Sequence, residues 1–210
     1  MSIDVKAMEE ALINTLKKFI PDEVSKVRGK PDDITGAPTY TPAILPARVF
    51  SANGSNKNPT IPDYPYCLVD YIRTVPDGVD LTERFFDDEG NYVYMTHKKV
   101  IMQIKFYGNS QNSTDNAVNK THMLMTVDGV RNYLDNEYRR LANTGTTVTA
   151  RARVRSKSEI IPSNFSMKDK YLETNEFNLI LATTDTVDIK VDQTEYFTDI
   201  ELEEANMNIN

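Results

Sequence analysis

The sequence has little of the side-chain chemistry on which metal sites and disulfides depend. Its 210 residues include one cysteine, Cys67, so neither an intrachain disulfide nor a cysteine-based metal site can form. The two histidines, His97 and His122, lack a second histidine, cysteine or carboxylate at the spacing that zinc sites use. We therefore expect no metal, no cofactor and no catalytic role at either histidine.

Sequence motifs of known reaction centres are also missing. There is no glycine-rich phosphate loop, no Gly-x-Ser-x-Gly elbow and no dinucleotide fingerprint. The carboxylates of 87–89 precede Gly90 and lack the ladder of a calcium loop, so we interpret them as a solvated turn. A hydrolase using Asp87, Asp88 or His97 is the least favoured alternative, because no base there has a nucleophile or metal partner. The sequence predicts a protein that is not an enzyme.

Long apolar runs and an excess of positive charge are absent as well. No apolar stretch approaches the ~20 residues that span a membrane. Asp4, Glu9 and Glu10 interrupt the pattern of a secretion signal. The formal net charge is -7, which disfavours nonspecific nucleic-acid binding by the whole surface, because phosphate contacts need a positive field. We expect a soluble protein that is made inside the cell and has no membrane partner.

A long strand followed by a long helix is the clearest pattern in the chain. Apolar residues alternate along the strand with a period of two, which predicts one buried and one wet face. The members of the buried face are Tyr92, Tyr94, Val100, Met102, Ile104 and Phe106. The following helix, predicted from about 114 to 141, has apolar residues every three or four positions. These are Leu124, Val127, Val130, Leu134, Tyr138 and Leu141.

The remaining pattern completes a fold prediction. Residues 3–20 read as an amphipathic helix that Pro21 ends, and 66–74 read as a central strand because both faces are apolar. Late strands are predicted at 146–155, 171–182 and 186–192. The fold class is α+β, with a mixed, mainly antiparallel sheet, two amphipathic helices packed on one face, and extended loops and arms. We expect a single domain over 1–193.

Two segments are expected to extend from that domain. Seven of the ten prolines lie within 29–65, so this stretch is predicted to be an extended loop. Residues 194–210 are acidic and polar, and we interpret them as a C-terminal arm.

A row of basic residues is the best candidate for an interface. Arg151, Arg153, Arg155 and Lys157 alternate with small or apolar residues, so a regular strand would place them on one side at intervals of roughly 7 Å. The row is either a solvated sheet face, a salt-bridged subunit contact, or a positive strip facing DNA or an acidic partner. The acidic arm, from the same chain or a neighbour, is one such partner through residues Glu201, Glu203 and Glu204.

The order of these elements resembles the tail terminator, or neck terminator, proteins of long-tailed bacteriophages. The resemblance covers roughly residues 8–200. The segments that carry it are 24–29 (VSKVRG), 65–69 (PYCLV), 104–108 (IKFYG), the helix start 114–117 (TDNA) and the late strand 187–193 (VDIKVDQ). Residues 29–62 and 77–91 look longer than the compact form of the family needs.

The resemblance implies a structural role in the virion. Family members are expected to form a hexameric ring on the last ring of tail-tube protein, which stops tube growth. The ring then presents a surface to neck, head-completion or connector proteins, with the tail sheath as a further neighbour, and DNA only passes through its lumen. The alternatives are another neck ring protein, a tube-like subunit, or a cytosolic binding module that uses the proline-rich loop.

Overall fold

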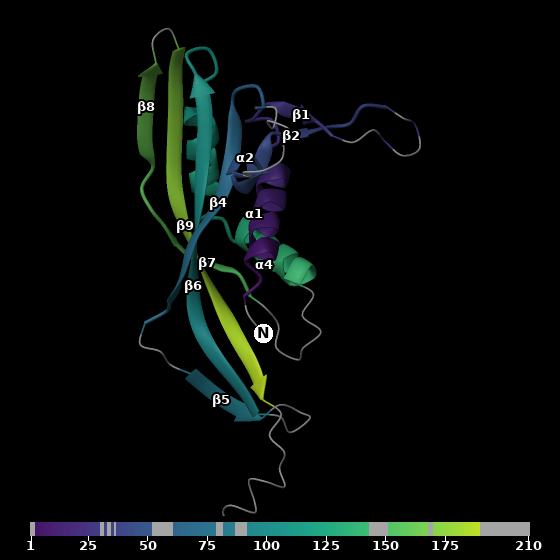
Figure 1. Ribbon diagram of the computed structural model, residues 1–210, viewed down its shortest axis with the longest axis vertical. Helices are drawn as coiled ribbons and strands as arrows, with labels where there is room; N and C mark the ends of the chain where they lie inside the picture. The colour runs from purple at the N-terminus through teal and green to yellow at the C-terminus, as the bar shows by residue number, and fades with distance from the viewer. Residues whose placement is uncertain are drawn as a thin grey trace, which may run out of the picture.

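The computed structural model describes residues 3–29, 32, 35, 37–51, 61–78, 82–86, 92–142, 151–167 and 170–189 (Figure 1). In chain order its elements are α1 (Val5–Phe19), β1 (Lys26–Arg28), β2 (Tyr40–Pro42), β3 (Ile44–Pro46), α2 (Arg48–Ser51), β4 (Tyr66–Pro76), β5 (Thr82–Phe86), β6 (Tyr92–Asn109), α3 (Asp115–Leu124), α4 (Asp128–Ala142), β7 (Arg153–Lys157), β8 (Ile161–Met167) and β9 (Lys170–Ile189).

One large sheet organises the structure. Its strand order is β3-β4-β6-β9-β7, with β5 also paired to β6 and β8 to β9. The central pair β6–β9 is antiparallel from Tyr92 opposite Ile189 to Asn109 opposite Leu172. Only the β3–β4 pair in this sheet is parallel among the described strands. The predicted α+β class with a mixed, mainly antiparallel sheet is therefore confirmed.

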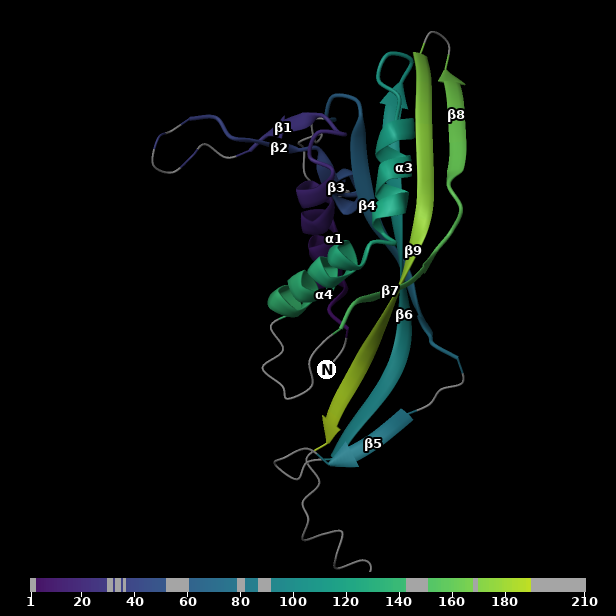
Figure 2. The same ribbon diagram turned by 180° about the vertical axis from the view of Figure 1, so that it is seen from behind.

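The hydrophobic core lies between one face of this sheet and the helices. The predicted buried face of the long strand is confirmed at four fully buried residues, Val100, Met102, Ile104 and Phe106. Phe177, Leu179 and Leu181 of β9 lie on the same face, because they pair with residues of that face of β6. Helices α1, α3 and α4 cover this side (Figure 1, Figure 2).

The prediction of a single long helix over 114–141 is wrong, because the chain turns between α3 and α4. The backbone N–H of Thr126 donates to the Met123 carbonyl and that of Val127 to the Leu124 carbonyl, each at 2.9 Å. These tight turns redirect the chain, so α3 follows the strands whereas α4 crosses toward α1 (Figure 2). Val127, predicted to be buried, is 46% exposed at this turn.

Other predicted elements differ at their ends. The helix over 3–20 is α1, and Asp4 is its N-cap because its carboxylate accepts from the Ala7 N–H at 2.8 Å. The predicted strand 171–182 and the described part of the predicted strand 186–192 belong to one continuous strand, β9, and 190–192 lie outside the described residues. The proline-rich stretch 29–65 contains the short elements β2, β3 and α2.

Part of the sheet projects beyond the helices. The pairing of β7 ends where Arg153 lies opposite Ala182, whereas β6 and β9 continue together to Tyr92 and Ile189. In this region β5 is the third strand, and the three form a ribbon that leads away from the helices (Figure 1). No helix within the described ranges is long and apolar enough to cross a membrane.

Candidate interface site

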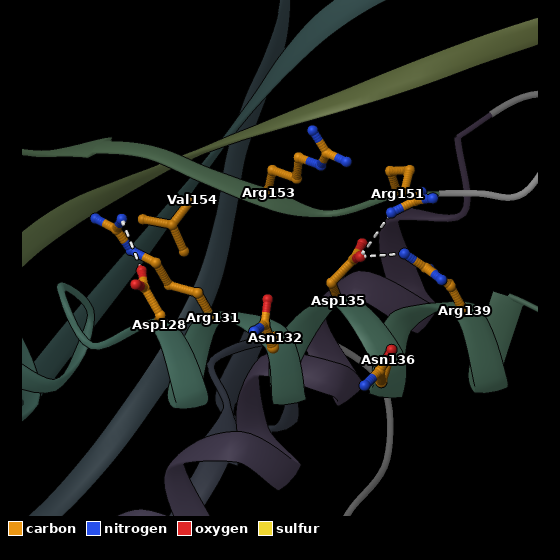
Figure 3. Close-up of a pocket in the computed structure, with 9 residues that line it drawn as sticks. All are labelled: Asp128, Arg131, Asn132, Asp135, Asn136, Arg139, Arg151, Arg153 and Val154. Atoms are coloured by element: carbon orange, nitrogen blue, oxygen red, sulfur yellow. Dashed lines mark hydrogen bonds and ion pairs between the residues drawn. The ribbon is translucent and has the colours of Figure 1, made fainter.

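A polar cleft of about 460 Å³ lies between α4 and β7 (Figure 3). Its walls are almost entirely charged or amide side chains, with a single apolar member. The lining residues are Asp128, Arg131, Asn132, Asp135, Asn136, Arg139, Arg151, Arg153 and Val154. The six from α4 recur at a spacing of three or four, which places them on one side of that helix. We call this site the arginine cleft, after its four arginines.

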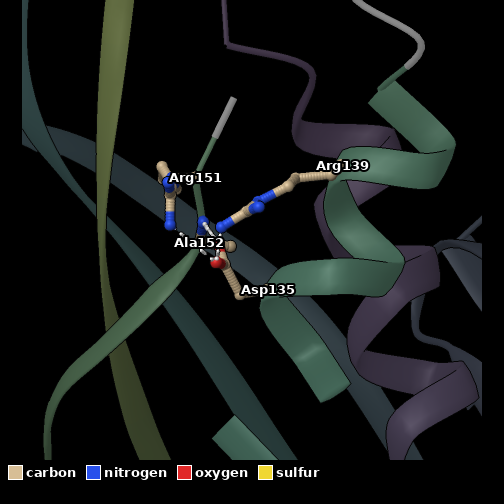
Figure 4. A network of polar contacts seen from close by, with 4 residues as sticks. All are labelled: Asp135, Arg139, Arg151 and Ala152. Carbon is tan, nitrogen blue, oxygen red and sulfur yellow. Dashed lines mark hydrogen bonds and ion pairs between the residues drawn. The ribbon is translucent and has the colours of Figure 1, made fainter. Parts of the chain in front are cut away.

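Asp135 is the central residue of the arginine cleft. It is 8% exposed, and its Oδ2 lies 2.5 Å from the Nη2 of Arg139 and 3.4 Å from the Nη1 of Arg151. Its Oδ1 accepts from the backbone N–H of Ala152 at 2.9 Å (Figure 4). Charged partners strengthen these hydrogen bonds. One carboxylate therefore ties the third turn of α4 to the chain that enters β7.

Replacing Asp135 with alanine is expected to lower the free energy of unfolding by about 2 kcal/mol. The change leaves the Ala152 N–H and two guanidiniums without their acceptor, but both arginines reach water, so the loss stays below that of a fully buried pair. Urea unfolding at neutral pH measures it. Asn136→Ala, an exposed neighbour on the same helix, is the matched control, and an equal loss in both variants would contradict this role.

The basic row does not lie on one side of a strand, so that prediction is wrong. Val154 pairs with Leu181 and Ser156 with Ile180, which leaves Arg155 as an extra residue in a β-bulge. A bulge reverses the alternation beyond it. Lys157 therefore shares a face with Val154, on the core side, whereas Arg153 lies on the opposite face.

The four basic residues consequently have separate surroundings. Arg151 and Arg153 line the arginine cleft. The ammonium of Lys157 donates to the carbonyl of His122 and to its Nδ1, the latter at 3.1 Å. Arg155 contributes to the field at Asp77, whose pKa is lowered chiefly by its hydrogen bond from Lys99. The acidic residues expected to face the row, Glu201, Glu203 and Glu204, lie outside the described residues, and that pairing stays a prediction.

Nothing in the sequence singles out the α4 side of the cleft. Asp135 and Arg139 are spaced i,i+4, a pattern common on any solvated helix face. What distinguishes them is the approach of β7, since Ala152 and Arg151 come from a distant part of the chain. The alternation of the basic row located Arg151 and Arg153 but not their partners.

Two other candidate residues, His122 and Cys67, lie in packed parts of the fold. The Nε2 of His122 donates to the Ser158 carbonyl at 2.9 Å, and its ring meets Phe177 edge-on at 5.1 Å. Cys67 is fully buried, which raises the pKa of its thiol. The carboxylates 87–89 lie outside the described residues. Within the part of the chain that the structure describes, no three histidine, cysteine or acidic side chains gather as a metal site would require.

Comparison with known proteins gives the family. The sequence model of a family described as phage neck terminator protein matches residues 10–206. No curated protein matches the chain. Because the match extends over nearly the whole sequence, the protein belongs to the phage neck terminator family, a family of structural components of the phage tail and neck.

Proposed function

We propose that the protein ends growth of the tail tube by forming a ring on the last ring of tube subunits. The observation that carries this proposal is the family match over residues 10–206. The opposite side of the ring receives a head-completion, neck or connector protein, and the tail sheath is a further neighbour. A hexamer, as the resemblance implies, leaves a lumen through which DNA passes. The subunit is made in the host cytoplasm, joins the virion, and has neither a cofactor nor a catalytic role.

The shape of the subunit supports this proposal. The ribbon of β5, β6 and β9 lies at one end of the long axis, and the tips of β8 and β9 lie at the other (Figure 1). A subunit in a closed ring contacts its two neighbours through different patches. If the two separated ends of the subunit contact its ring neighbours, its remaining surfaces are available to bind the tail tube on one side of the ring and the neck on the other. The arginine cleft, lined by two ion pairs within α4 and one from Asp135 to Arg151 just before β7, fits a contact surface better than a reaction centre.

A tube-capping assay tests the proposal. Tail-tube protein is polymerised with and without the purified chain, and filament lengths and ends are recorded by negative-stain electron microscopy. We expect shorter tubes, each with a ring at one end, and a mean length that falls as the ratio of this chain to tube protein rises. Serum albumin at equal concentration is the control for crowding.

Two results of these experiments would favour a different function for the protein. Unchanged tube lengths together with binding to a head-completion or connector protein would identify a different neck ring component. A protein that is monomeric by light scattering, and that binds neither tube nor neck proteins, would favour a cytosolic binding module. Either result would contradict capping.

A further inference from the structure

The arginine cleft has more positive charge than its own acidic residues neutralise. Four arginines and two aspartates line it. Asp128 lies 4.0 Å from Arg131, and its side chain is 92% exposed, so this pair contributes little. Asp135 is the remaining carboxylate, and it is shared between Arg139 and Arg151. Arg153 has no ion-pair partner among the residues that the structure describes.

The guanidiniums of the cleft also have unused donors. The Nε of Arg139 is buried and has no hydrogen-bond partner in the described structure. Arg151 reaches Asp135 only at 3.4 Å and is 40% exposed. A guanidinium presents five N–H donors in a planar fork that matches a carboxylate. The volume, about 460 Å³, falls in the range of ligand sites, roughly 300–1,000 Å³. The cleft therefore has both the charge and the space for carboxylate side chains.

The chain itself contains a segment of the matching chemistry. Residues 194–210 include five acidic residues and neither lysine nor arginine. These acids are Glu195, Asp199, Glu201, Glu203 and Glu204. A nucleic acid is the less suitable anion. The chain carries a net charge of -7, and the positive charge of the cleft covers only a small part of the surface.

The end of β9 is the last described part of the chain before this segment. Arg153 lies opposite Ala182, and β9 then continues for seven residues to Ile189, roughly 24 Å further along the strand. β9 thus ends at the ribbon tip, at a distance from the cleft (Figure 1). From Ile189 to Glu201 the chain spans up to roughly 40 Å, which is long enough to reach a subunit alongside.

We propose that the arginine cleft of one subunit binds the acidic segment 195–204 of a neighbouring copy. The contact is heterologous, since cleft and segment are different patches, and repeating it around an axis closes a ring. This inference rests on the proposed ring and names the residues that join its subunits. Arg153 and Arg151 are the cleft residues that meet the incoming carboxylates.

Charge exchange between full-length chains tests the contact. The cleft-reversed variant combines Arg151→Glu and Arg153→Glu, which takes the net charge of the lining residues from +2 to -2. The segment-reversed variant combines Glu201→Lys, Glu203→Lys and Glu204→Lys, which takes the net charge of 195–204 from -5 to +1. Each alone is expected to associate at least about tenfold more weakly at low salt, measured by sedimentation velocity, because every subunit contact then joins like charges. An equimolar mixture is expected to recover the ring, since alternating subunits pair each reversed segment with a reversed cleft. Arg28→Glu, an exposed arginine on β1, is the matched control.

Several outcomes overturn the assignment, and one separates it from the proposed function. Recovery in a chain that carries both reversals, without recovery in the mixture, would place the segment in the cleft of its own chain. A monomeric wild type, or rings indifferent to both reversals, would exclude this contact. Duplex DNA binding that the cleft-reversed variant abolishes would assign the cleft to phosphates. A failed capping assay with normal charge exchange would contradict the proposed function alone.

Discussion

Phe177→Ala is expected to lower the free energy of unfolding by about 3–5 kcal/mol, the usual cost of removing a buried aromatic ring. Phe177 is 1% exposed on the core face of β9, opposite Ile104 of β6. Its ring also meets that of His122, which belongs to α3. The substitution opens a cavity where the two central strands meet a helix, and these rigid neighbours cannot collapse into it.

Chemical denaturation followed by circular dichroism measures this loss. Phe177→Leu is the matched control, because it keeps most of the buried volume and should lose only about 1 kcal/mol. If alanine and leucine were equally tolerated, with a loss below about 1 kcal/mol in each, Phe177 would not be part of the core described here.

Glu173→Ala is expected to cost about 2–4 kcal/mol, because it disrupts a buried network of hydrogen bonds. The Oε1 of Glu173 accepts from the N–H of Thr114 at 3.0 Å, from its hydroxyl at 2.6 Å, and from Ser113 and Asn175 at 3.1 Å each. Thr114 is the N-cap of α3 but forms no side-chain capping bond of its own. A carboxylate from β9 thus takes the capping role, at the end of the helix that favours negative charge.

This network also makes stability depend on pH. Burial acts to raise the pKa of Glu173, but hydrogen bonds from Thr114 and Ser113 outweigh it and hold that pKa below the ordinary value of 4.5. A lowered folded-state pKa contributes stability above the unfolded-state value, and that stability is lost as pH falls through the folded-state pKa. The difference in unfolding free energy between wild type and Glu173→Gln should therefore stay constant from pH 7 down toward 4.5 and shrink as the pH falls further, toward about pH 3.

Urea unfolding of both proteins across that pH range is the measurement. Glu159→Gln supplies the control for a general change of charge, since Glu159 lies outside the network. If the wild type and Glu173→Gln lost stability in parallel as the pH was lowered, the carboxylate of Glu173 would not be what holds this end of α3.

The central strand was predictable because its pattern and its environment agree. Apolar residues at every second position from Val100 to Phe106 fit one face against helices, and no tertiary contact has to override that preference. The break between α3 and α4 was not predictable in the same way. Thr126 and Val127 are tolerated within helices, and the turn is set by the docking of α4 on α1, where Phe19 meets Tyr133 edge-on at 5.6 Å.

The arginine cleft was half predictable for a related reason. Arg151 and Arg153 stand out in the sequence as members of a basic row. The bulge at Arg155 does not, because one extra residue in the register leaves the alternation of residue types unchanged. Asp135 acquires its importance only from Arg151 and Ala152, which follow it by 16 and 17 residues, and local periodicity cannot detect such contacts.

The pairing of β6 with β9 has a consequence for the order of folding. Asn109 and Leu172 are 63 positions apart in the chain, and Tyr92 and Ile189 are 97 apart. Contacts between such distant residues form late, because a large loop must close before any of them is made. During synthesis, β6 leaves the ribosome well before its partner exists. The sheet can be completed only when β9 has been made, so the nascent chain depends on its helices and on β4 for early structure.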